Sequence, residues 1–292
     1  MINFIKQKII KIFNLDKITD NQNEIKKLLG EATLKEEKEA NNINDYELKI
    51  FSQFGEDGII DYLIKSLKIE EKNFIEFGVE NYEEANTRFL LESRNWSGLI
   101  FDSSKEHIDF IKGKNYYWKQ NLIAKCEFIT SENINSLIQE HNGDREVGLL
   151  SIDVDGNDYW IWKAINGIIP KIVVIEYNAR LGKKKSIVTP YKKDFNRIKE
   201  HHSSIYFGAS LMAIYKLAKE KNYSLVGTNI NGSNAFCVHN DVLKNSNIKS
   251  LSPEQCFHKN SFNELRDEKG NILDRDEKKE KEILSKMDFV ET

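Results

Sequence analysis

The chain has 292 residues, of which 40% are hydrophobic and 30% charged, a composition typical of a globular protein. Its 43 Lys and Arg residues against 46 Asp and Glu residues give a formal net charge of -3, which argues against a nucleic-acid-binding protein because such proteins usually carry a basic excess. The three cysteines lie far apart and form no CxxC pair and no even disulfide framework, so we interpret them as reduced thiols of a cytoplasmic protein.

Neither a membrane-spanning helix nor a signal peptide is expected. The longest apolar runs are strand-length, as at residues 172–175, whereas a spanning helix needs roughly 20 apolar residues. Residues 1–15 form a short basic amphipathic pattern without a long apolar core or a small-residue cleavage site. Two interpretations stay open for them: a helix that packs on the rest of the chain or on a second subunit, and a weak contact with a membrane surface.

Charge and apolar patterns divide the chain into three parts. Residues 1–50 predict a helical N-terminal extension, and residues 241–292 predict a strongly charged C-terminal extension that is either a solvated helix or a mobile tail. Residues 51–240 alternate strand-like runs with helical patterns, which predicts one domain with a sizeable core. The two extensions are the parts through which a homo-oligomer could assemble.

The elements of the central domain follow one another in a regular order. In chain order, the patterns predict a strand at 74–78, a helix at 83–94, a strand at 98–101, a helix at 104–112, a strand at 116–119, a helix capped by Ser131, a strand at 147–152, a helix at 159–165, a strand at 171–175, a helix at 209–220 and a hairpin of strands 223–228 and 235–238. This alternation predicts an α/β fold with a parallel sheet and right-handed crossovers.

The order of these elements resembles the seven-stranded, Rossmann-like fold of S-adenosylmethionine (SAM)-dependent methyltransferases. In that fold the sheet is mostly parallel and ends in an antiparallel hairpin, whereas an ordinary dinucleotide-binding fold would continue with alternating strands and helices. The resemblance implies SAM as the cofactor, and open α/β sheets bind their ligands at the carboxyl ends of the strands.

Polar and small residues at the predicted strand ends strengthen the resemblance. Residues 76–80, Glu-Phe-Gly-Val-Glu, are similar to methyltransferase motif I, although one glycine stands where several are usual. The absence of a Cβ at Gly78 would let the cofactor approach the backbone. Asp102, after the second strand, is placed to accept hydrogen bonds from ribose hydroxyls. Asn121, after the third strand, sits where this family usually contacts the adenine edge.

A more specific motif precedes the first strand. Residues 52–56, Ser-Gln-Phe-Gly-Glu, resemble the Ser-Gln-aromatic-Gly-acid motif of FkbM-like methyltransferases, a family often found among enzymes that decorate bacterial surface polysaccharides and capsules. Residues 86–87 and 94–99 extend this resemblance, which covers about residues 51–240. The cofactor contacts that it implies are Gln53, Glu76, Gly78, Glu80, Asn86, Thr87, Asp102, Ser103, Asn121 and Asp153.

Residues 149–158 place three carboxylates and an amide after the fourth strand. If the fourth and fifth strands are neighbours, Asp153 and Glu176 face each other. This arrangement resembles metal-dependent O-methyltransferases of the catechol type, in which Mg²⁺ is held by oxygen ligands and lowers the pKa of a substrate hydroxyl. The predicted metal ligands are Asp153, Asp155, Glu176 and Asn178. The alternative stays open that these residues cap helices and bind the cofactor without a metal.

Three residues are candidates for catalysis: Asp153, His201 and His202. A histidine near the methyl acceptor could remove the proton of a hydroxyl group, since its unperturbed pKa suits neutral pH. The sequence does not choose between the two histidines, and both are also consistent with ordinary loop residues.

Together these patterns predict a cytoplasmic, SAM-dependent O-methyltransferase that acts on a sugar or sugar-phosphate hydroxyl in the biosynthesis of bacterial surface polysaccharide, such as capsule. Two alternatives stay open. One is a Mg²⁺-dependent phosphohydrolase that uses Asp153 and Asp155. The other is a non-catalytic binding subunit with the same fold, since motif I has a single glycine.

Overall fold

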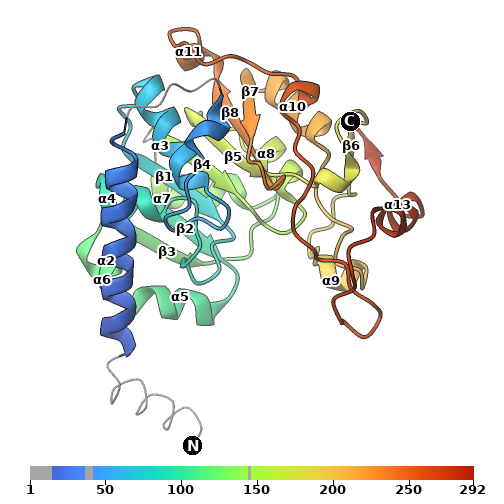
Figure 1. The fold of residues 1–292 in the computed structure, drawn as a ribbon, viewed down its shortest axis with the longest axis horizontal. Coiled ribbons are helices and arrows are strands. Elements are labelled where there is room, and N and C mark those ends of the chain that lie inside the picture. The colour runs from blue at the N-terminus through green and yellow to red at the C-terminus, as the bar shows by residue number, and fades with distance from the viewer. Residues whose placement is uncertain (1–14, 37–41, 144–145) are drawn as a thin grey trace, which may run out of the picture.

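The structure, a computed structural model, describes residues 15–36, 42–143 and 146–292. Its centre is a seven-stranded sheet with helices on both faces (Figure 1). The strands of this sheet are β1 (Asn73–Phe77), β2 (Ser97–Asp102), β3 (Leu122–Cys126), β4 (Leu149–Ile152), β5 (Ile172–Glu176), β7 (Tyr223–Thr228) and β8 (Asn234–His239).

The strand order across the sheet is β3-β2-β1-β4-β5-β8-β7. The first five strands pair in parallel, whereas β8 runs antiparallel to both β5 and β7. The predicted fold, a mostly parallel Rossmann-like methyltransferase sheet with a terminal antiparallel hairpin, is therefore confirmed. The order reverses between β1 and β4, and in open α/β sheets the carboxyl ends beside such a reversal border the ligand crevice.

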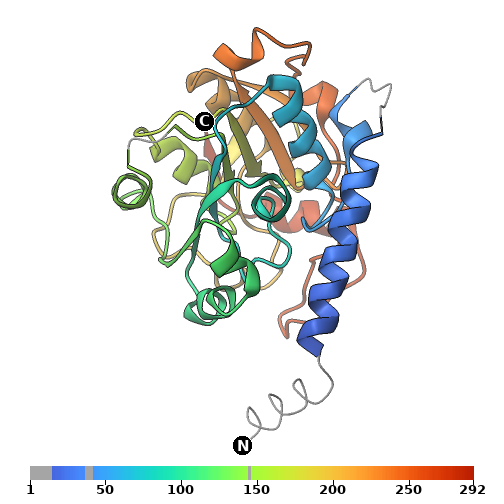
Figure 2. The ribbon, with the colours of Figure 1, turned by 90° about the vertical axis from the view of Figure 1, so that its left-hand side faces the viewer.

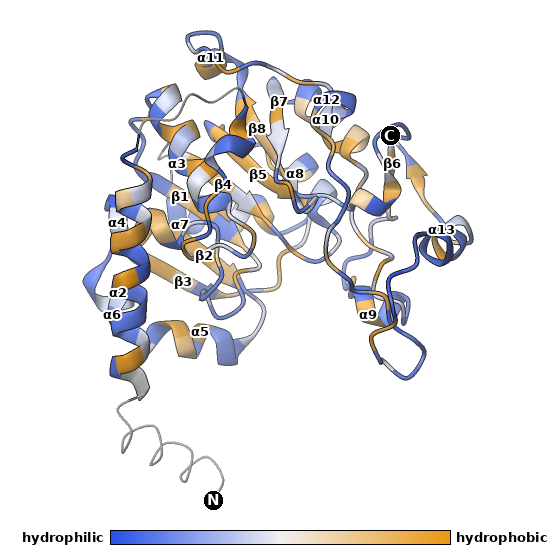
Figure 3. Ribbon diagram, in the orientation of Figure 1, coloured by the Kyte–Doolittle hydropathy of each residue, from blue (hydrophilic) through white to orange (hydrophobic). Residues whose placement is uncertain are grey.

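Alternate residues of each strand contribute to two hydrophobic cores. In β5, Val173 and Ile175 belong to one core, and Ile172 and Val174 belong to the other, because successive side chains of a strand point to opposite faces. One face is covered by α7 (Ile134–Asn142), α8 (Asp158–Ala164) and α10 (Leu211–Glu220), and the other by α3 (Glu56–Leu67), α4 (Arg88–Arg94) and α5 (Lys105–Lys112) (Figure 2). Burial on both faces explains the continuous apolar runs of the strands (Figure 3).

One predicted strand is a helix. Residues 116–119 lie in α6 (Asn115–Lys119), and the third strand is β3 instead. The ring of Tyr116 is buried 5.8 Å from that of Tyr82, while Trp118 is 72% exposed. A run of aromatic residues favours a strand by local propensity, but the tertiary packing of Tyr116 overrides that preference here.

The helix expected at 83–94 begins only at Arg88. The carboxylate of Glu76 accepts hydrogen bonds from the backbone N–H groups of Asn86 and Thr87. These bonds hold the segment before α4 as a loop against the end of β1, so the first predicted turn does not form.

The helix α7 also begins later than expected. Its N-cap is Asn133, not Ser131. The side chain of Asn133 accepts a hydrogen bond from the backbone N–H of Thr130 at 2.8 Å, and the Thr130 hydroxyl accepts one from the N–H of Asn133 at 3.2 Å. This reciprocal pair forms the turn that precedes the helix, and Ser131 lies within the turn.

The N-terminal part contains α2 (Leu15–Thr33) and the short helix η1 (Ile43–Tyr46). The long helix α2 runs beside α4 and α6 (Figures 1 and 2). Lys27 lies 3.5 Å from Glu92 of α4, and Asn115 of α6 donates to Asp20 at 2.9 Å. Its outer face leaves four large apolar side chains exposed, those of Ile18, Ile25, Leu28 and Leu29. The predicted amphipathic contact of residues 1–15 falls almost wholly outside the described residues, and assembly through the extensions stays a prediction.

The C-terminal part folds against the central sheet and its insertion. It contains α11 (Asn240–Leu243), α12 (Pro253–Cys256), α13 (Glu277–Ser285) and β9 (Val290–Glu291), and the insertion contains η2 (Ala179–Leu181), β6 (Ile187–Val188) and α9 (Arg197–Glu200). Strand β9 pairs with β6, and Leu284 of α13 is buried, so the described charged segment forms a packed helix and a paired strand. None of the helices within the described ranges is long and apolar enough to cross a membrane.

Candidate functional site

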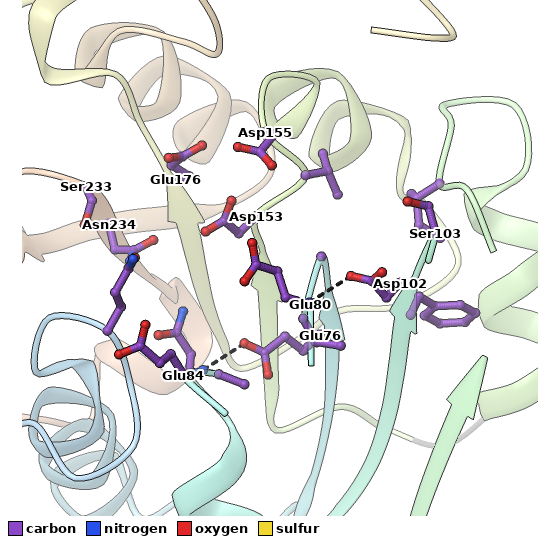
Figure 4. Close-up of a pocket in the computed structure, with 18 of the residues that line it drawn as sticks. Glu76, Glu80, Glu84, Asp102, Ser103, Asp153, Asp155, Glu176, Ser233 and Asn234 are labelled. Carbon is purple, nitrogen blue, oxygen red and sulfur yellow. Dashed lines mark hydrogen bonds between the residues drawn. The ribbon is translucent and has the colours of Figure 1, made fainter. Parts of the chain in front are cut away.

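A cavity of about 640 Å³ lies at the carboxyl ends of β1, β2, β4 and β5 (Figure 4). Its lining is strongly acidic. Among the described residues, the carboxylates that line it are Glu76, Glu80, Glu83, Glu84, Asp102, Glu127, Asp153, Asp155, Glu176 and Glu264. Arg197 contributes the only Lys or Arg side chain of this lining within the same residues. The site therefore suits a cationic ligand better than an anionic one, because a cleft lined by one sign of charge attracts the opposite sign.

The turn after β1 is shaped by close contact with the end of β4. Gly78 has a φ of +71°, and a Cβ at this position would lie 1.6 Å from the carbonyl oxygen of Asp153. Glycine is thus required for contact between two loops of the protein, whereas the sequence suggested that it makes room for the cofactor. Glu80 and Tyr82 also have left-handed φ angles, of 47° and 64°, and such strain often clusters at functional sites.

Glu76, at the end of β1, lines the cavity and holds the loop that precedes α4. Its carboxylate accepts hydrogen bonds from the backbone N–H of Asn86 at 2.9 Å and from the N–H and hydroxyl of Thr87. Burial raises the pKa of Glu76 to about 7, although these hydrogen bonds oppose the shift. Asn86 lines the pocket, but Thr87 is fully buried and absent from the lining. The predicted cofactor contact of Thr87 is therefore replaced by a positioning role toward Glu76.

Asp102, at the end of β2, ties the loops after β1 and β2 together. Its Oδ2 accepts a hydrogen bond from the backbone N–H of Glu80 at 2.8 Å, and its Oδ1 accepts one from the N–H of Ser104 at 2.8 Å. The Nδ1 atom of His107 lies 3.2 Å from the same Oδ1. Asp102 and Ser103 both line the cavity, so the structure brings these two predicted residues to the site.

Asn121 lies at the amino end of β3, whereas the cavity lies at the carboxyl ends of the strands. It precedes β3, and its carbonyl oxygen accepts a hydrogen bond from Gly98 near the start of β2. The predicted contact of Asn121 with adenine is therefore wrong, because it depended on the misassigned third strand. The residues that follow β3 and line the cavity are Glu127, Phe128 and Ile129. The short apolar run at residues 122–124 is the sequence signal that could have located this strand.

Three carboxylates meet at the ends of β4 and β5. Oxygens of Asp153, Asp158 and Glu176 all lie within 4.8 Å of one another. Burial and the mutual repulsion of these acids raise the pKa of Asp153 and of Glu176 well above their ordinary values. The carboxylate of Asp158 also accepts hydrogen bonds from the backbone N–H groups of Val154 and Gly156, so it shapes the loop after β4.

This cluster corrects the predicted set of metal ligands. The predicted facing of Asp153 and Glu176 is present (Figure 4), and Asp158 joins them. Asn178 is not part of this cluster: its amide nitrogen donates to the carbonyls of Ile205 and Phe207 at 2.9 and 3.0 Å, and its Oδ1 accepts from the backbone N–H of Arg180. The Asn178 side chain holds the insertion against the end of β5.

Asp155 forms an ion pair with Arg197, a residue that no sequence motif indicated. Asp155 is exposed, has a φ of 57°, and its Oδ1 lies 2.9 Å from Nη1 of Arg197. Arg197 also pairs with Glu264 and donates to the carbonyl oxygen of Ser204. Its guanidinium lies 4.1 Å from the ring centre of Phe207. Arg197 and Glu264 reach the site from the insertion and from the C-terminal part, which their positions in the sequence do not reveal.

The two candidate histidines lie outside the cavity lining. The Nδ1 atom of His201 is 2.6 Å from the hydroxyl oxygen of Ser203, and the rings of His201 and His202 are 4.3 Å apart. Burial and the neighbouring His202 lower the pKa of His201. Neither ring faces the pocket in this structure, so the predicted role of these residues as a base is not supported by their placement.

The motif at residues 52–56, with the adjoining Asp57, joins the pocket to β8. The buried carboxylate of Asp57 accepts hydrogen bonds from the backbone N–H groups of Ile50, Phe51 and Ser52. The Oε1 atom of Glu56 accepts from the side-chain amides of Asn229 and Asn234, at 2.7 and 2.9 Å. The motif thereby presents Gln53 and Phe54 to the cavity.

No protein-family profile and no curated protein sequence matches this chain. Among solved structures, the chain is similar to the N-terminal domain of EvdMO1 with SAH bound, at 7% identity, a TM-score of 0.39, and coverage of 63% of this chain and 79% of that chain. It is also similar to a SAM-dependent methyltransferase from Clostridium acetobutylicum, at 11% identity, a TM-score of 0.38, and coverage of 63% of this chain and 90% of that chain. A third similar structure is TehB from Haemophilus influenzae, at 11% identity, a TM-score of 0.38, and coverage of 68% of this chain and 67% of that chain. At these identities and TM-scores the likeness assigns no activity to this chain.

Proposed function

We propose that this chain is a SAM-dependent methyltransferase. The observation that carries the proposal is the position of Asp102, which lines the cavity beside the turn after β1, at the reversal of the strand order. A carboxylate at the end of the second strand is suited to accept hydrogen bonds from two ribose hydroxyls, as in other nucleotide-binding α/β sheets.

Several residues of the cavity fit the parts of SAM. Phe101, Phe128 and Ile129 line the cavity near Asp102 and offer an apolar wall for adenine. The carboxylates of Glu76 and Glu80 also line the cavity and complement the positive charges of the methionine end. SAM would supply an electrophilic methyl group, and the contribution of the chain would be to hold the acceptor atom in line with it.

For the acceptor, we propose a carbohydrate hydroxyl, and for the setting, cytoplasmic synthesis of surface polysaccharide. Both finer statements derive from the FkbM-like resemblance of residues 51–240. A sugar phosphate is the less favoured form, because the ten carboxylates of the described cavity lining would repel a phosphate. The same charge argues against the phosphohydrolase alternative. The residues that would hold a Mg²⁺ ion are Asp153, Asp158 and Glu176, and the ion would lower the pKa of the acceptor hydroxyl.

Calorimetric titration of the full chain with S-adenosylhomocysteine (SAH) tests the proposal. We expect saturable binding with one site per chain, and adenosine monophosphate serves as a control that carries a phosphate in place of the amino-acid end. Absence of SAH binding would contradict the proposal. Release of phosphate from sugar phosphates in the presence of Mg²⁺ would favour the phosphohydrolase instead, and SAH binding without transfer to any acceptor would favour the binding subunit.

A further inference from the structure

Two residues that line the cavity from neighbouring strands each carry a buried oxygen without a hydrogen-bond partner among the described residues. Glu176 of β5 and Asn234 of β8 are register partners in the antiparallel pair, and both line the cavity. Neither Oε2 of Glu176 nor Oδ1 of Asn234 has a hydrogen-bond partner among the described residues. Directly opposed residues of an antiparallel pair have Cβ atoms about 5 Å apart, so the two side chains start from neighbouring points of the sheet.

The orientation of the Asn234 amide is determined by its neighbour. Its Nδ2 donates to Oε1 of Glu56 at 2.9 Å, and a flipped amide would place an oxygen against that carboxylate. Asn234 is only 6% exposed. A buried polar atom without a partner costs free energy, so this Oδ1 is expected to find a donor on a bound ligand.

The groups that Asp153, Glu176 and Asn234 offer at this point of the cavity are carboxylate and amide oxygens. Asp153 lies beside Glu176, with carboxylate oxygens within 4.8 Å of each other, as Figure 4 shows. Among the described residues that line the cavity, Arg197 is the only Lys or Arg, and its guanidinium already pairs with Asp155 and Glu264. Within the part of the chain that the structure describes, Oε2 of Glu176 and Oδ1 of Asn234 thus remain without a donor.

Aromatic side chains form the adjoining wall. Phe54 and Phe262 line the cavity, and their rings are stacked with centres 5.4 Å apart. Aromatic faces attract organic cations, whereas they offer no ligand atom to a metal ion.

We propose that the methyl acceptor carries a protonated amine, which Asp153, Glu176 and Asn234 bind. A primary ammonium group has three N–H donors and one positive charge, which matches three acceptors of which two are carboxylates. This inference rests on the proposed methyltransferase function and narrows its substrate class to amine-bearing compounds, such as amino sugars. The amine is the group by which the acceptor is recognised, and the atom that receives the methyl group is the hydroxyl oxygen proposed above.

The first experiment compares matched ligands on the SAH-loaded full chain by calorimetry, at a pH where the amine is protonated. The probes are glucosamine, glucose and glucose 6-phosphate, together with ethanolamine and ethylene glycol as a smaller pair. We expect each amine to bind at least about tenfold more tightly than its neutral counterpart, and the phosphate to bind more weakly than glucose. Equal affinities within the pairs, or no binding of either amine by a chain that binds SAH, would overturn the inference.

The second experiment assigns the site. Glu176→Gln keeps the shape of the side chain and removes its charge, and Glu106→Gln removes a charge from the exposed surface of α5. We expect Glu176→Gln to weaken amine binding at least tenfold with SAH affinity retained, and Glu106→Gln to change neither. Unchanged amine binding in Glu176→Gln would overturn the assignment, as would tight binding of Mg²⁺ or Mn²⁺ that excludes the amine. Absence of SAH binding, by contrast, would contradict the proposed methyltransferase function itself.

Discussion

The backbone N–H of Glu80 donates a hydrogen bond to Oδ2 of Asp102 at 2.8 Å, so the end of β2 holds the turn that follows β1. Glu80 has a left-handed φ of 47°, which is unfavourable for a residue with a Cβ. Asp102 thereby has two functions in one position: it lines the cavity, and it stabilises the strained turn that forms the adjacent wall.

Replacing Asp102 tests its proposed contact with ribose. We expect Asp102→Ala to weaken SAH binding by about 10- to 100-fold, because a hydrogen bond to a charged group is worth about 1.5–3 kcal/mol. Calorimetry measures the affinity, and urea unfolding reports any loss of the turn. Asp109→Asn, an exposed acid of α5 paired with Lys105, is the control and should bind as the wild type does. Unchanged affinity in Asp102→Ala would remove the ribose assignment.

The stability of the protein should depend on pH through Asp57. Burial raises the pKa of Asp57 from 3.8 to about 6, and hydrogen bonds from Ile50, Phe51 and Ser52 oppose the shift. Since the folded state holds this proton more tightly than the unfolded state, the free energy of unfolding falls as pH rises from about 4 to about 6. The loss through this group is about 3 kcal/mol.

Asp57→Asn isolates this contribution. The acceptor Oδ2 can be retained, and the new amide nitrogen occupies the place of Oδ1, which has no partner among the described residues. Urea unfolding at a series of pH values should show a flatter curve for Asp57→Asn than for the wild type between pH 4 and pH 6. Asp109→Asn should leave the slope as it is. Parallel curves for wild type and Asp57→Asn would show that Asp57 does not titrate in this range.

Arg197 should stabilise the contact between the insertion and the C-terminal part. Its ion pairs with Asp155 and Glu264 are lost in Arg197→Gln, which leaves those acids in an already acidic cavity. We expect the free energy of unfolding to fall by about 2 kcal/mol. In a double-mutant cycle, Glu264→Gln should recover part of this loss in the Arg197→Gln background. Additive effects of the two substitutions would contradict a coupling between these residues.

Gly78 should not tolerate a side chain. In Gly78→Ala the new Cβ would collide with the carbonyl oxygen of Asp153 at 1.6 Å, and the φ of +71° is unfavourable for alanine. We expect a loss of about 3 kcal/mol or more in urea unfolding. Gly167→Ala is the matched control, since nothing lies within 4 Å of its added Cβ, and it should change stability by less than about 1 kcal/mol. Similar losses in both variants would show that the contact with Asp153 is not the cause.

The fold could be predicted from local patterns because most strands are buried on both faces and read as apolar runs. The ends of β1, β2, β4 and β5 fall at or within a residue or two of the acids that mark them. The third strand was misplaced, because the aromatic residues of α6 have high strand propensity and only the packing of Tyr116 against Tyr82 shows otherwise. Because of that error, Asn121 was expected at the carboxyl end of the third strand, whereas it precedes the amino end of β3.

The amino-acid sequence by itself determined the α/β class, the terminal hairpin and the acids at the strand ends, because these depend on periodicity and on neighbours along the chain. Only the tertiary structure decided what those acids meet. It brought Arg197 and Glu264 to the cavity, turned Asn178 toward the insertion, and placed Asn234 opposite Glu176 in the sheet. The physical reason is that a side chain's hydrogen-bond partners are selected by long-range packing, which residue spacing along the chain does not encode.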